Sequence, residues 1–150
     1  MQKRIRMAAV LAALVTLCLS TASSSLADHA EKQFFDPSEG KAPFSRAVRV
    51  GDTLYLSGAL GIKDRKLVAG GVGPETAQAL ENIKASLAEH GLGMDDVVKC
   101  TVFLADIADF AAMNEVYMTA FAPPRPARSA LAVSGLALQS NVEIECLAAF

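Results

Sequence analysis

Apolar and polar residues alternate along two neighbouring segments, residues 45–50 (SRAVRV) and 53–60 (TLYLSGAL), which the turn-compatible pair Gly51-Asp52 separates. A period of two is typical of half-buried β-strands. In the second segment, this period would place Leu54 and Leu56 on one face. A turn and a short apolar run follow. The pattern therefore predicts three strands, at residues 45–50, 53–60 and 66–69.

Two later segments carry apolar residues at helical spacing. The first predicts a helix over residues 74–90, and the second a helix that Asp109 can cap and that ends before Pro123. The expected buried stripes are Leu80, Ile83 and Leu87 in the first helix, and Phe110, Met113, Tyr117 and Phe121 in the second.

Residues 97–105 are rich in β-branched side chains and apolar on both faces, which indicates a central strand. Two more strands are expected at residues 127–133 and 142–149. The order βββ-α-β-α-ββ predicts an α+β domain with two helices on one face of a mixed or antiparallel sheet. Because no further helix can cover the other face, we expect self-association there.

The N-terminal residues have the pattern of a secretory signal peptide over residues 1–27. Lys3, Arg4 and Arg6 precede an apolar run, and Ser25-Leu26-Ala27 supplies the small residues of a cleavage site. A membrane anchor is the alternative, but the 13 residues from Met7 to Leu19 are short for a bilayer that needs about 20. We therefore expect a periplasmic or secreted protein.

Cleavage near Ala27 would leave a polar N-terminal arm, residues 28–42, and one domain, residues 43–150. It would also remove three basic groups, so 11 Lys and Arg (14 − 3) would face 16 Asp and Glu, a formal charge of −5. Nucleic acid binding needs clustered positive charge, so we do not expect a nucleic acid partner.

The mature chain would keep two cysteines, Cys100 and Cys146, and two histidines, His29 and His90. Their spacing matches no metal motif and both histidines are expected near solvent, so no metal site is expected. An oxidising compartment would permit a disulfide between the two cysteines. Both are expected on strands, however, and we favour their burial as free thiols.

Residues 42–150 closely resemble the RidA (reactive intermediate deaminase, YjgF-like) family. The segments that carry the resemblance are APFSRAVRVGDTLYLSG, ETAQALENIKASLAEHG, MDDVVKCTVFLADIADFAAMNEVY, PARSALAV and VEIE, in that order. The resemblance implies a chorismate-mutase-like fold and a homotrimer in which the sheets pack around a central barrel. Such a trimer would cover the second face of the sheet.

The same resemblance implies a 2-iminobutanoate/2-iminopropanoate deaminase-type hydrolase that works in intersubunit clefts. Its substrates would be reactive 2-imino and 2-enamino acids, such as 2-aminoacrylate and 2-iminopropionate, and its products 2-oxo acids and ammonia. Water adds to a polarised C=N carbon in this reaction, so no cofactor is expected.

The resemblance assigns the substrate carboxylate to Arg128, whose guanidinium can meet it through two parallel hydrogen bonds. Glu143 would hold the attacking water. Ser57 and Gly58 would line the cleft, and Asn114 corresponds to an asparagine of the family. The ordinary alternatives for the arginine are a side chain that extends to solvent at the start of a strand, or an intersubunit ion pair. The ordinary alternative for the glutamate is a residue on the exposed face of its strand.

This chain departs from the family at several positions, and two of them belong to the expected binding site. Phe44 stands where a tyrosine is usual, and Ala130 where some members have cysteine. The lost hydroxyl favours a second hypothesis, a weakly or non-catalytic small-molecule-binding or stress-protective (chaperone-like) envelope protein that uses the same cleft. The ribonuclease activity sometimes ascribed to the family is disfavoured by the acidic charge and by export.

Overall fold

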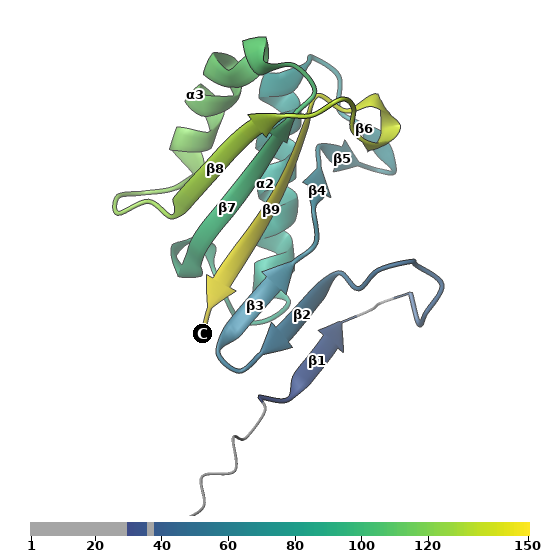
Figure 1. The fold of residues 1–150 in the computed structure, drawn as a ribbon, viewed down its shortest axis with the longest axis vertical. Coiled ribbons are helices and arrows are strands. Elements are labelled where there is room, and N and C mark those ends of the chain that lie inside the picture. The colour runs from purple at the N-terminus through teal and green to yellow at the C-terminus, as the bar shows by residue number, and fades with distance from the viewer. Residues whose placement is uncertain (1–29, 36–37) are drawn as a thin grey trace, which may run out of the picture. The chain divides into compact units, whose positions relative to one another are not determined.

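The computed structural model describes residues 30–35 and 38–150, so the expected signal peptide lies outside the described residues. The helices and strands are β1 (Lys32–Phe35), β2 (Ala47–Val50), β3 (Thr53–Leu56), β4 (Ala59–Leu60), β5 (Ile62–Lys63), β6 (Lys66–Leu67), α2 (Val72–Ala88), β7 (Val97–Leu104), α3 (Phe110–Ala120), β8 (Ala127–Ala132) and β9 (Val142–Ala149) (Figure 1). Neither described helix has the length and apolar character required to cross a membrane.

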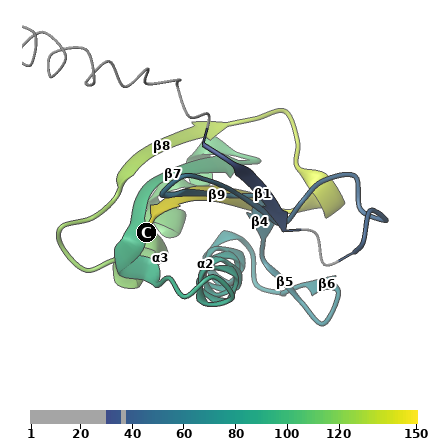
Figure 2. The same ribbon diagram turned by 90° about the horizontal axis from the view of Figure 1, so that it is seen from below.

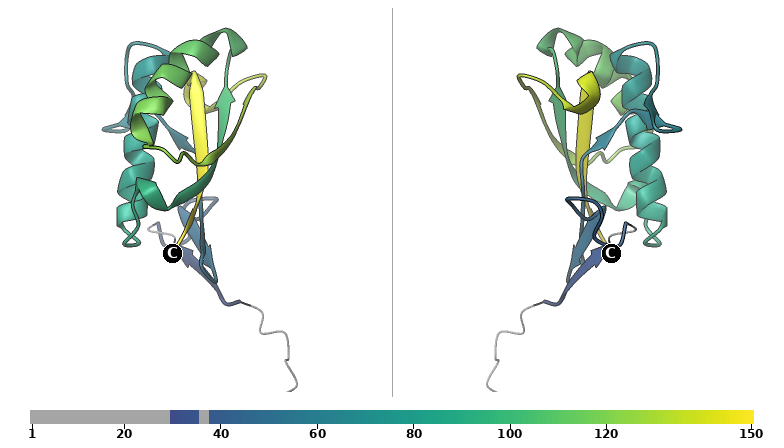
Figure 3. Two further views of the ribbon diagram at one scale, coloured as in Figure 1. Left: turned by 90° about the vertical axis from the view of Figure 1, so that its left-hand side faces the viewer. Right: turned by 90° about the vertical axis from the view of Figure 1, so that its right-hand side faces the viewer.

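Seven strands form one mixed sheet in the order β1-β2-β3-β9-β7-β8, with β4 also paired to β9. β7 and β8 are parallel, and the other pairs of this sheet are antiparallel. Both helices lie on the same face of the sheet, as Figures 2 and 3 show from three directions. The expected α+β architecture, a mixed sheet with two helices on one face, is therefore confirmed.

The core lies between this sheet face and the helices, where alternate strand residues point inward. Its largest fully buried members include Leu54 of β3, Val102 and Leu104 of β7, Val142 and Ile144 of β9, and Ile83, Leu87 and Met113 of the helices. The opposite face is open in the single chain and carries exposed Tyr55 and Leu131. This open face is the one that the sequence pattern left without a cover.

The strand expected over residues 53–60 is interrupted at Ser57-Gly58. The Ser57 amide donates to the Arg46 carbonyl at 3.0 Å, and its hydroxyl donates to the Ser45 carbonyl at 2.7 Å. These bonds tie the break to the segment before β2, while β4 resumes pairing on β9. The interruption is important because two expected site residues form it.

The expected arm, residues 28–42, includes strand β1, which pairs with β2 at the edge of the sheet. Phe35 packs against the core and against the His90 ring, with 4.3 Å between the ring centroids. His90 is therefore half-buried. The expectation that this histidine faces solvent is wrong. Phe34 points outward and is 66% exposed.

The start of α3 also differs from the expected one. A 3-10 turn, Ile107–Asp109, precedes the helix, so Asp106 and not Asp109 provides the side-chain cap, accepting from the Ala108 amide at 2.9 Å. Phe110, expected in the buried stripe, is 39% exposed at the first position of the helix.

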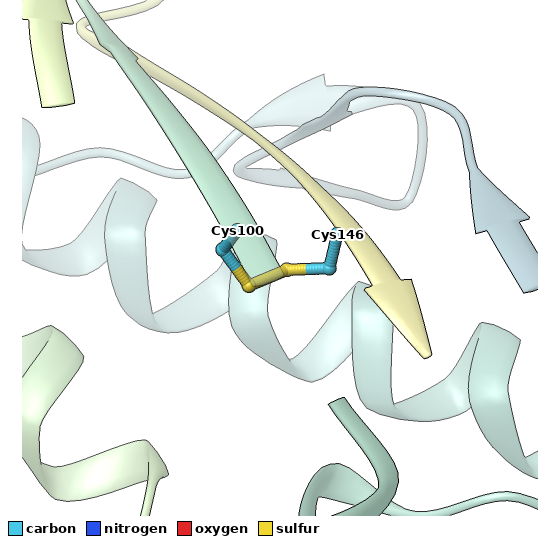
Figure 4. The surroundings of a disulfide bond; sticks show 2 residues. All are labelled: Cys100 and Cys146. Carbon is cyan, nitrogen blue, oxygen red and sulfur yellow. A yellow bond between two sulfur atoms is a disulfide. The ribbon is translucent and has the colours of Figure 1, made fainter. Parts of the chain in front are cut away.

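The expectation of free thiols is wrong, because Cys100 and Cys146 form a disulfide (Figure 4). The antiparallel register of β7 and β9 places the two residues directly opposite each other, with 4.1 Å between their Cα atoms. Both side chains are buried on the helix side of the sheet. Strand pairing alone thus brings together two cysteines that are 46 residues apart.

We expect alkylation of the oxidised, denatured protein to leave both cysteines unmodified, and alkylation after reduction to label both, as read by peptide mass. Cys100→Ala should lower the free energy of unfolding by about 2–4 kcal/mol, because the cross-link restricts the unfolded chain. The double variant Cys100→Ala/Cys146→Ala should cost little more, since the first change already removes the bond. Separate, additive costs in urea denaturation would contradict a disulfide.

Candidate functional site

The expected site residues fall into two groups on opposite faces of the sheet. Arg128 lies opposite Cys100 in the β7–β8 pairing, so it belongs to the face that packs against the helices. Glu143 lies opposite Phe103 in the β7–β9 pairing, three residues further along β7. Because side chains alternate along a strand, Phe103 and Glu143 belong to the open face.

Arg128 projects from edge strand β8 toward α3. Its Nη2 donates a hydrogen bond to Asn114 Oδ1 at 2.8 Å, and its Cζ lies 4.5 Å from the centroid of the Tyr117 ring and 5.7 Å from that of Phe110. Two aromatic faces and one amide therefore orient the guanidinium. Ala130 follows two residues later on the same strand face and packs against the core.

The Arg128 guanidinium is half-buried, and no carboxylate among the described residues forms an ion pair with it. A partly desolvated cation is stabilised by an anion within hydrogen-bonding reach. Guanidinium groups bind carboxylates in a planar, two-bond arrangement. This group can therefore hold a small organic anion between α3 and the edge of the sheet.

Sequence reasoning placed Tyr117 in the core and missed its contact with the guanidinium. Phe110, Asn114 and Tyr117 are spaced i, i+4 and i+7, so they share one helix face, and the asparagine could have indicated this neighbourhood. Burial raises the pKa of the Tyr117 hydroxyl above its ordinary value of 10.0, and the nearby Arg128 charge opposes that shift. Its hydroxyl is buried without a hydrogen-bond partner among the described residues.

The second group surrounds the interruption between β3 and β4. The Glu143 carboxylate lies against Gly58 so closely that a Cβ atom at that glycine would collide with it. A side chain at position 58 would therefore have to displace the Glu143 carboxylate, and glycine leaves room for it beside the backbone. The neighbouring Ser57 hydroxyl already donates to a carbonyl, so its oxygen can act as an acceptor from a ligand.

A buried carboxylate that sequence reasoning missed holds the start of β9. Glu75, in the first turn of α2, is 4% exposed and accepts hydrogen bonds from the amide and the side chain of Asn141. Asn141 lies two residues before Glu143. The Glu75 carboxylate therefore helps to fix the start of β9, in which Glu143 is the second residue. No local sequence pattern connects residues 66 positions apart.

A cavity of about 520 Å³ lies on the helix side of the same interruption. Ser57, Gly58 and Phe44 line it together with residues of α2, and Phe44 is 64% exposed. A second cavity, also about 520 Å³, lies on the other side of Ser57-Gly58, between Tyr55 and Thr101 of the open face. The interruption therefore separates two cavities.

Residues 30–35 and 38–150 contain no group of three or more His, Cys, Asp or Glu side chains that could hold a metal ion. The first group provides the oriented Arg128 guanidinium on the helix face of the sheet. The second provides the Glu143 carboxylate beside the backbone of Gly58, on the open face. Together they can bind a small carboxylic acid and place a water molecule, provided that they meet across two chains.

The fold is that of the small α+β proteins of the YjgF/RidA class, which solved structures share. RidA from the Antarctic bacterium Psychrobacter sp. superposes with a TM-score of 0.70 at 35% identity, covering 81% of this chain and 98% of that one. The chain belongs to the RidA/YjgF family, since the profile of the family described as Endoribonuclease L-PSP matches residues 37–150.

Curated relatives agree with this assignment. RutC family protein UK114 of Drosophila melanogaster is 48% identical over 109 residues, which cover 71% of this chain and 79% of the relative. The 2-iminobutanoate/2-iminopropanoate deaminase of Mus musculus is 45% identical over 108 residues, covering 71% of this chain and 80% of that enzyme.

The raised pKa of Tyr117 predicts a loss of stability in alkali. The unfolded chain ionises this hydroxyl above pH 10.0, whereas the folded chain keeps it protonated, so its contribution is full below that pH and is lost as pH rises through the folded value. The free energy of unfolding should fall by up to about 1.4 kcal/mol per pH unit in that range. Tyr117→Phe should remove this component in urea denaturation.

The chain has two tyrosines, so Tyr55→Phe isolates the absorbance change of Tyr117 as it ionises. In that variant the titration should lie above pH 10.0. An equally steep alkaline loss of stability in wild type and Tyr117→Phe would contradict the assignment.

Proposed function

We propose that this protein hydrolyses reactive 2-imino and 2-enamino acids, such as 2-iminopropionate and 2-aminoacrylate, to 2-oxo acids and ammonia. The observation that carries the proposal is the half-buried Arg128 guanidinium, oriented by Asn114 and unpaired with any carboxylate of the described chain. Relatives named 2-iminobutanoate/2-iminopropanoate deaminase, at 45% identity in mouse and 44% in rat, support the same reaction.

The complete site would form between two protomers of a homotrimer. Arg128 and Glu143 lie on opposite faces of one sheet, so a single small substrate cannot contact both within one chain. A second protomer packed on the open face could bring its Arg128, beside Asn114 and Ala130, to the first protomer's Glu143, Ser57 and Gly58. The exposed apolar residues of that face, including Tyr55 and Leu131, support such packing.

In this cleft the Arg128 fork would hold the substrate carboxylate and fix the plane of the adjacent C=N bond. Glu143 would position a water molecule, whose oxygen bonds to the imine carbon while a proton reaches the nitrogen. The C–N bond of the resulting adduct then breaks, ammonia departs, and the remaining hydroxyl loses its proton to give the 2-oxo acid. Holding two reactants in place supplies much of the acceleration.

We propose that the protein works outside the cytoplasm, in the periplasm or as a secreted protein, after removal of residues 1–27. The Cys100–Cys146 bond supports this location, because disulfides form and persist in oxidising compartments. Imines formed in the envelope would then be its substrates.

The names of the relatives do not favour the weakly catalytic binding protein as an alternative. Phe44, whose ring lines the cavity beside Ser57, offers apolar surface in place of a hydroxyl. This difference bears on which substrate is accepted, not on the two groups that would hold the carboxylate and the water.

Replacing either proposed catalytic residue should abolish turnover. With imino acids generated by an amino-acid oxidase, wild type should accelerate keto-acid release. Arg128→Ala should lose the carboxylate contact and fall to the background rate, and Glu143→Gln should lose about 10²-fold or more. Arg125→Ala, at an exposed residue near Arg128, and Glu81→Gln, at an exposed residue of α2 that lines neither cavity, serve as controls and should retain activity. Equal rates for wild type and Arg128→Ala would exclude the proposed reaction.

Mixing the two inactive variants tests whether the site lies between protomers. After joint refolding of Arg128→Ala with Glu143→Gln, some interfaces should combine an intact arginine from one chain with an intact glutamate from another. If equal amounts of the two variants assemble at random into a head-to-tail ring, about a quarter of the interfaces contain both intact residues, so about a quarter of wild-type activity should return. No recovery in mixed oligomers, confirmed by mass, would place both groups of each site in a single chain.

A further inference from the structure

The cavity between the segment before β2 and helix α2 shares Ser57 and Gly58 with the proposed site. Ser57 and Gly58 form its boundary with the site, and its far wall consists of α2 residues, including Ile83 and Ala85. Its volume of about 520 Å³ is within the range of small-molecule sites. The methyl group of an alanine-derived imine would leave most of this space unfilled.

The polar groups around this cavity are largely paired with each other. Asn82 Nδ2 donates to the carbonyls of Leu60 and Ile62 at 2.9 Å each, and Asn82 Oδ1 accepts from Gln78. The buried Ser86 hydroxyl, which has no hydrogen-bond partner among the described residues, is a polar group of the lining that remains to bind a ligand, and it is uncharged.

An ion pair closes one side of the cavity. Arg46 Nη1 donates to Glu89 Oε1 at 2.8 Å, which joins the segment before β2 to the end of α2. Both side chains are about half exposed, so neither charge is directed at a buried ligand. The cavity therefore offers no uncompensated charge for an acidic or basic side chain.

Apolar surface makes up most of the remaining lining. Leu56 and Ile83 form part of the buried core, and Phe44 stands at the cavity with 64% of its surface exposed. An aromatic ring left this open beside a cavity gains free energy when another apolar group covers it. The lining is complementary to an aliphatic or aromatic group.

We infer that this cavity receives the side chain of the substrate, so that the enzyme prefers 2-imino acids with large apolar side chains over the alanine-derived imine. The inference rests on the proposed function, since Arg128 and Glu143 would place the carboxylate and the C=N carbon beside Gly58. From there the substituent on the imine carbon extends past Ser57 toward Phe44 and α2. The residue types of this cavity, not those of the carboxylate site, then determine specificity.

Selectivity between two substrates tests the inference. We compare kcat/KM for the imines made from leucine and from alanine in wild type, Ala85→Leu and Ala88→Leu. Ala85 is exposed on α2 and lines the cavity, so a leucine there narrows it, whereas exposed Ala88 does not line it and serves as the control. Oligomer mass and thermal unfolding are recorded for each variant.

Wild type should favour the leucine-derived imine by about tenfold or more, since several additional methylene groups are buried. Ala85→Leu should lower kcat/KM for the leucine-derived imine by about tenfold, because the larger side chain is sterically excluded from the narrowed cavity. It should change kcat/KM for the alanine-derived imine by less than about twofold. Ala88→Leu should leave both unchanged. Phe44→Ala, which removes an exposed ring and so spares the fold, should also reduce the preference for the larger substrate.

Equal losses for both substrates, or unchanged selectivity in both Ala85→Leu and Phe44→Ala, would overturn the inference. If Ala85→Leu changes the oligomer mass but not the selectivity, the cavity is occupied by part of a neighbouring protomer and not by the substrate side chain, which also overturns the inference. Wild-type activity on the alanine-derived imine tests the proposed function separately. If that activity is present while selectivity does not respond to either variant, only the side-chain assignment fails.

Discussion

The antiparallel pairing of β7 with β9 is the constraint on which the rest of this structure depends. These two strands lie at the centre of the part of the sheet that the helices cover, and their register decides which side chains share a face. A shift by one residue would exchange the two faces of a strand and expose the core. The Cys100–Cys146 bond joins the strands at one matched pair and so excludes such a shift.

This register also determines the form of the site. Through it, and through the parallel pairing of β8, Arg128 belongs to the helix face and Glu143 to the open face. The two groups that the proposed chemistry needs are thereby separated within one chain. Association of protomers would then serve two purposes, covering apolar surface and completing a catalytic site.

Each half of the site is held by buried contacts. On one side, Asn114 and Tyr117 of α3 orient the guanidinium, and on the other, the Glu75 carboxylate anchors the loop that leads into Glu143. Pre-organisation of this kind reduces the reorganisation needed when charge develops on a substrate. The interruption at Ser57-Gly58 adds the third element, because its two residues line both cavities. Reaction and specificity would therefore use different sides of the same short segment.

Local patterns in the sequence predicted the two long helices and the central strands, but not the edge strand β1 in the expected arm or the exposure of Phe110. Strand and helix periods correctly identified α2, α3, β7 and β9, because burial of one side imposes a period that is visible in any short window. The resemblance correctly indicated the fold. Its assignment of Arg128, Glu143 and Gly58 to the site stays a prediction. Only the tertiary structure decided that the cysteines pair, that the strand over residues 53–60 is interrupted, and that Tyr117 contacts Arg128. These features depend on the register between strands and on contacts between residues far apart in the chain. Neither is encoded in local periodicity, since both emerge only when separate elements pack against each other.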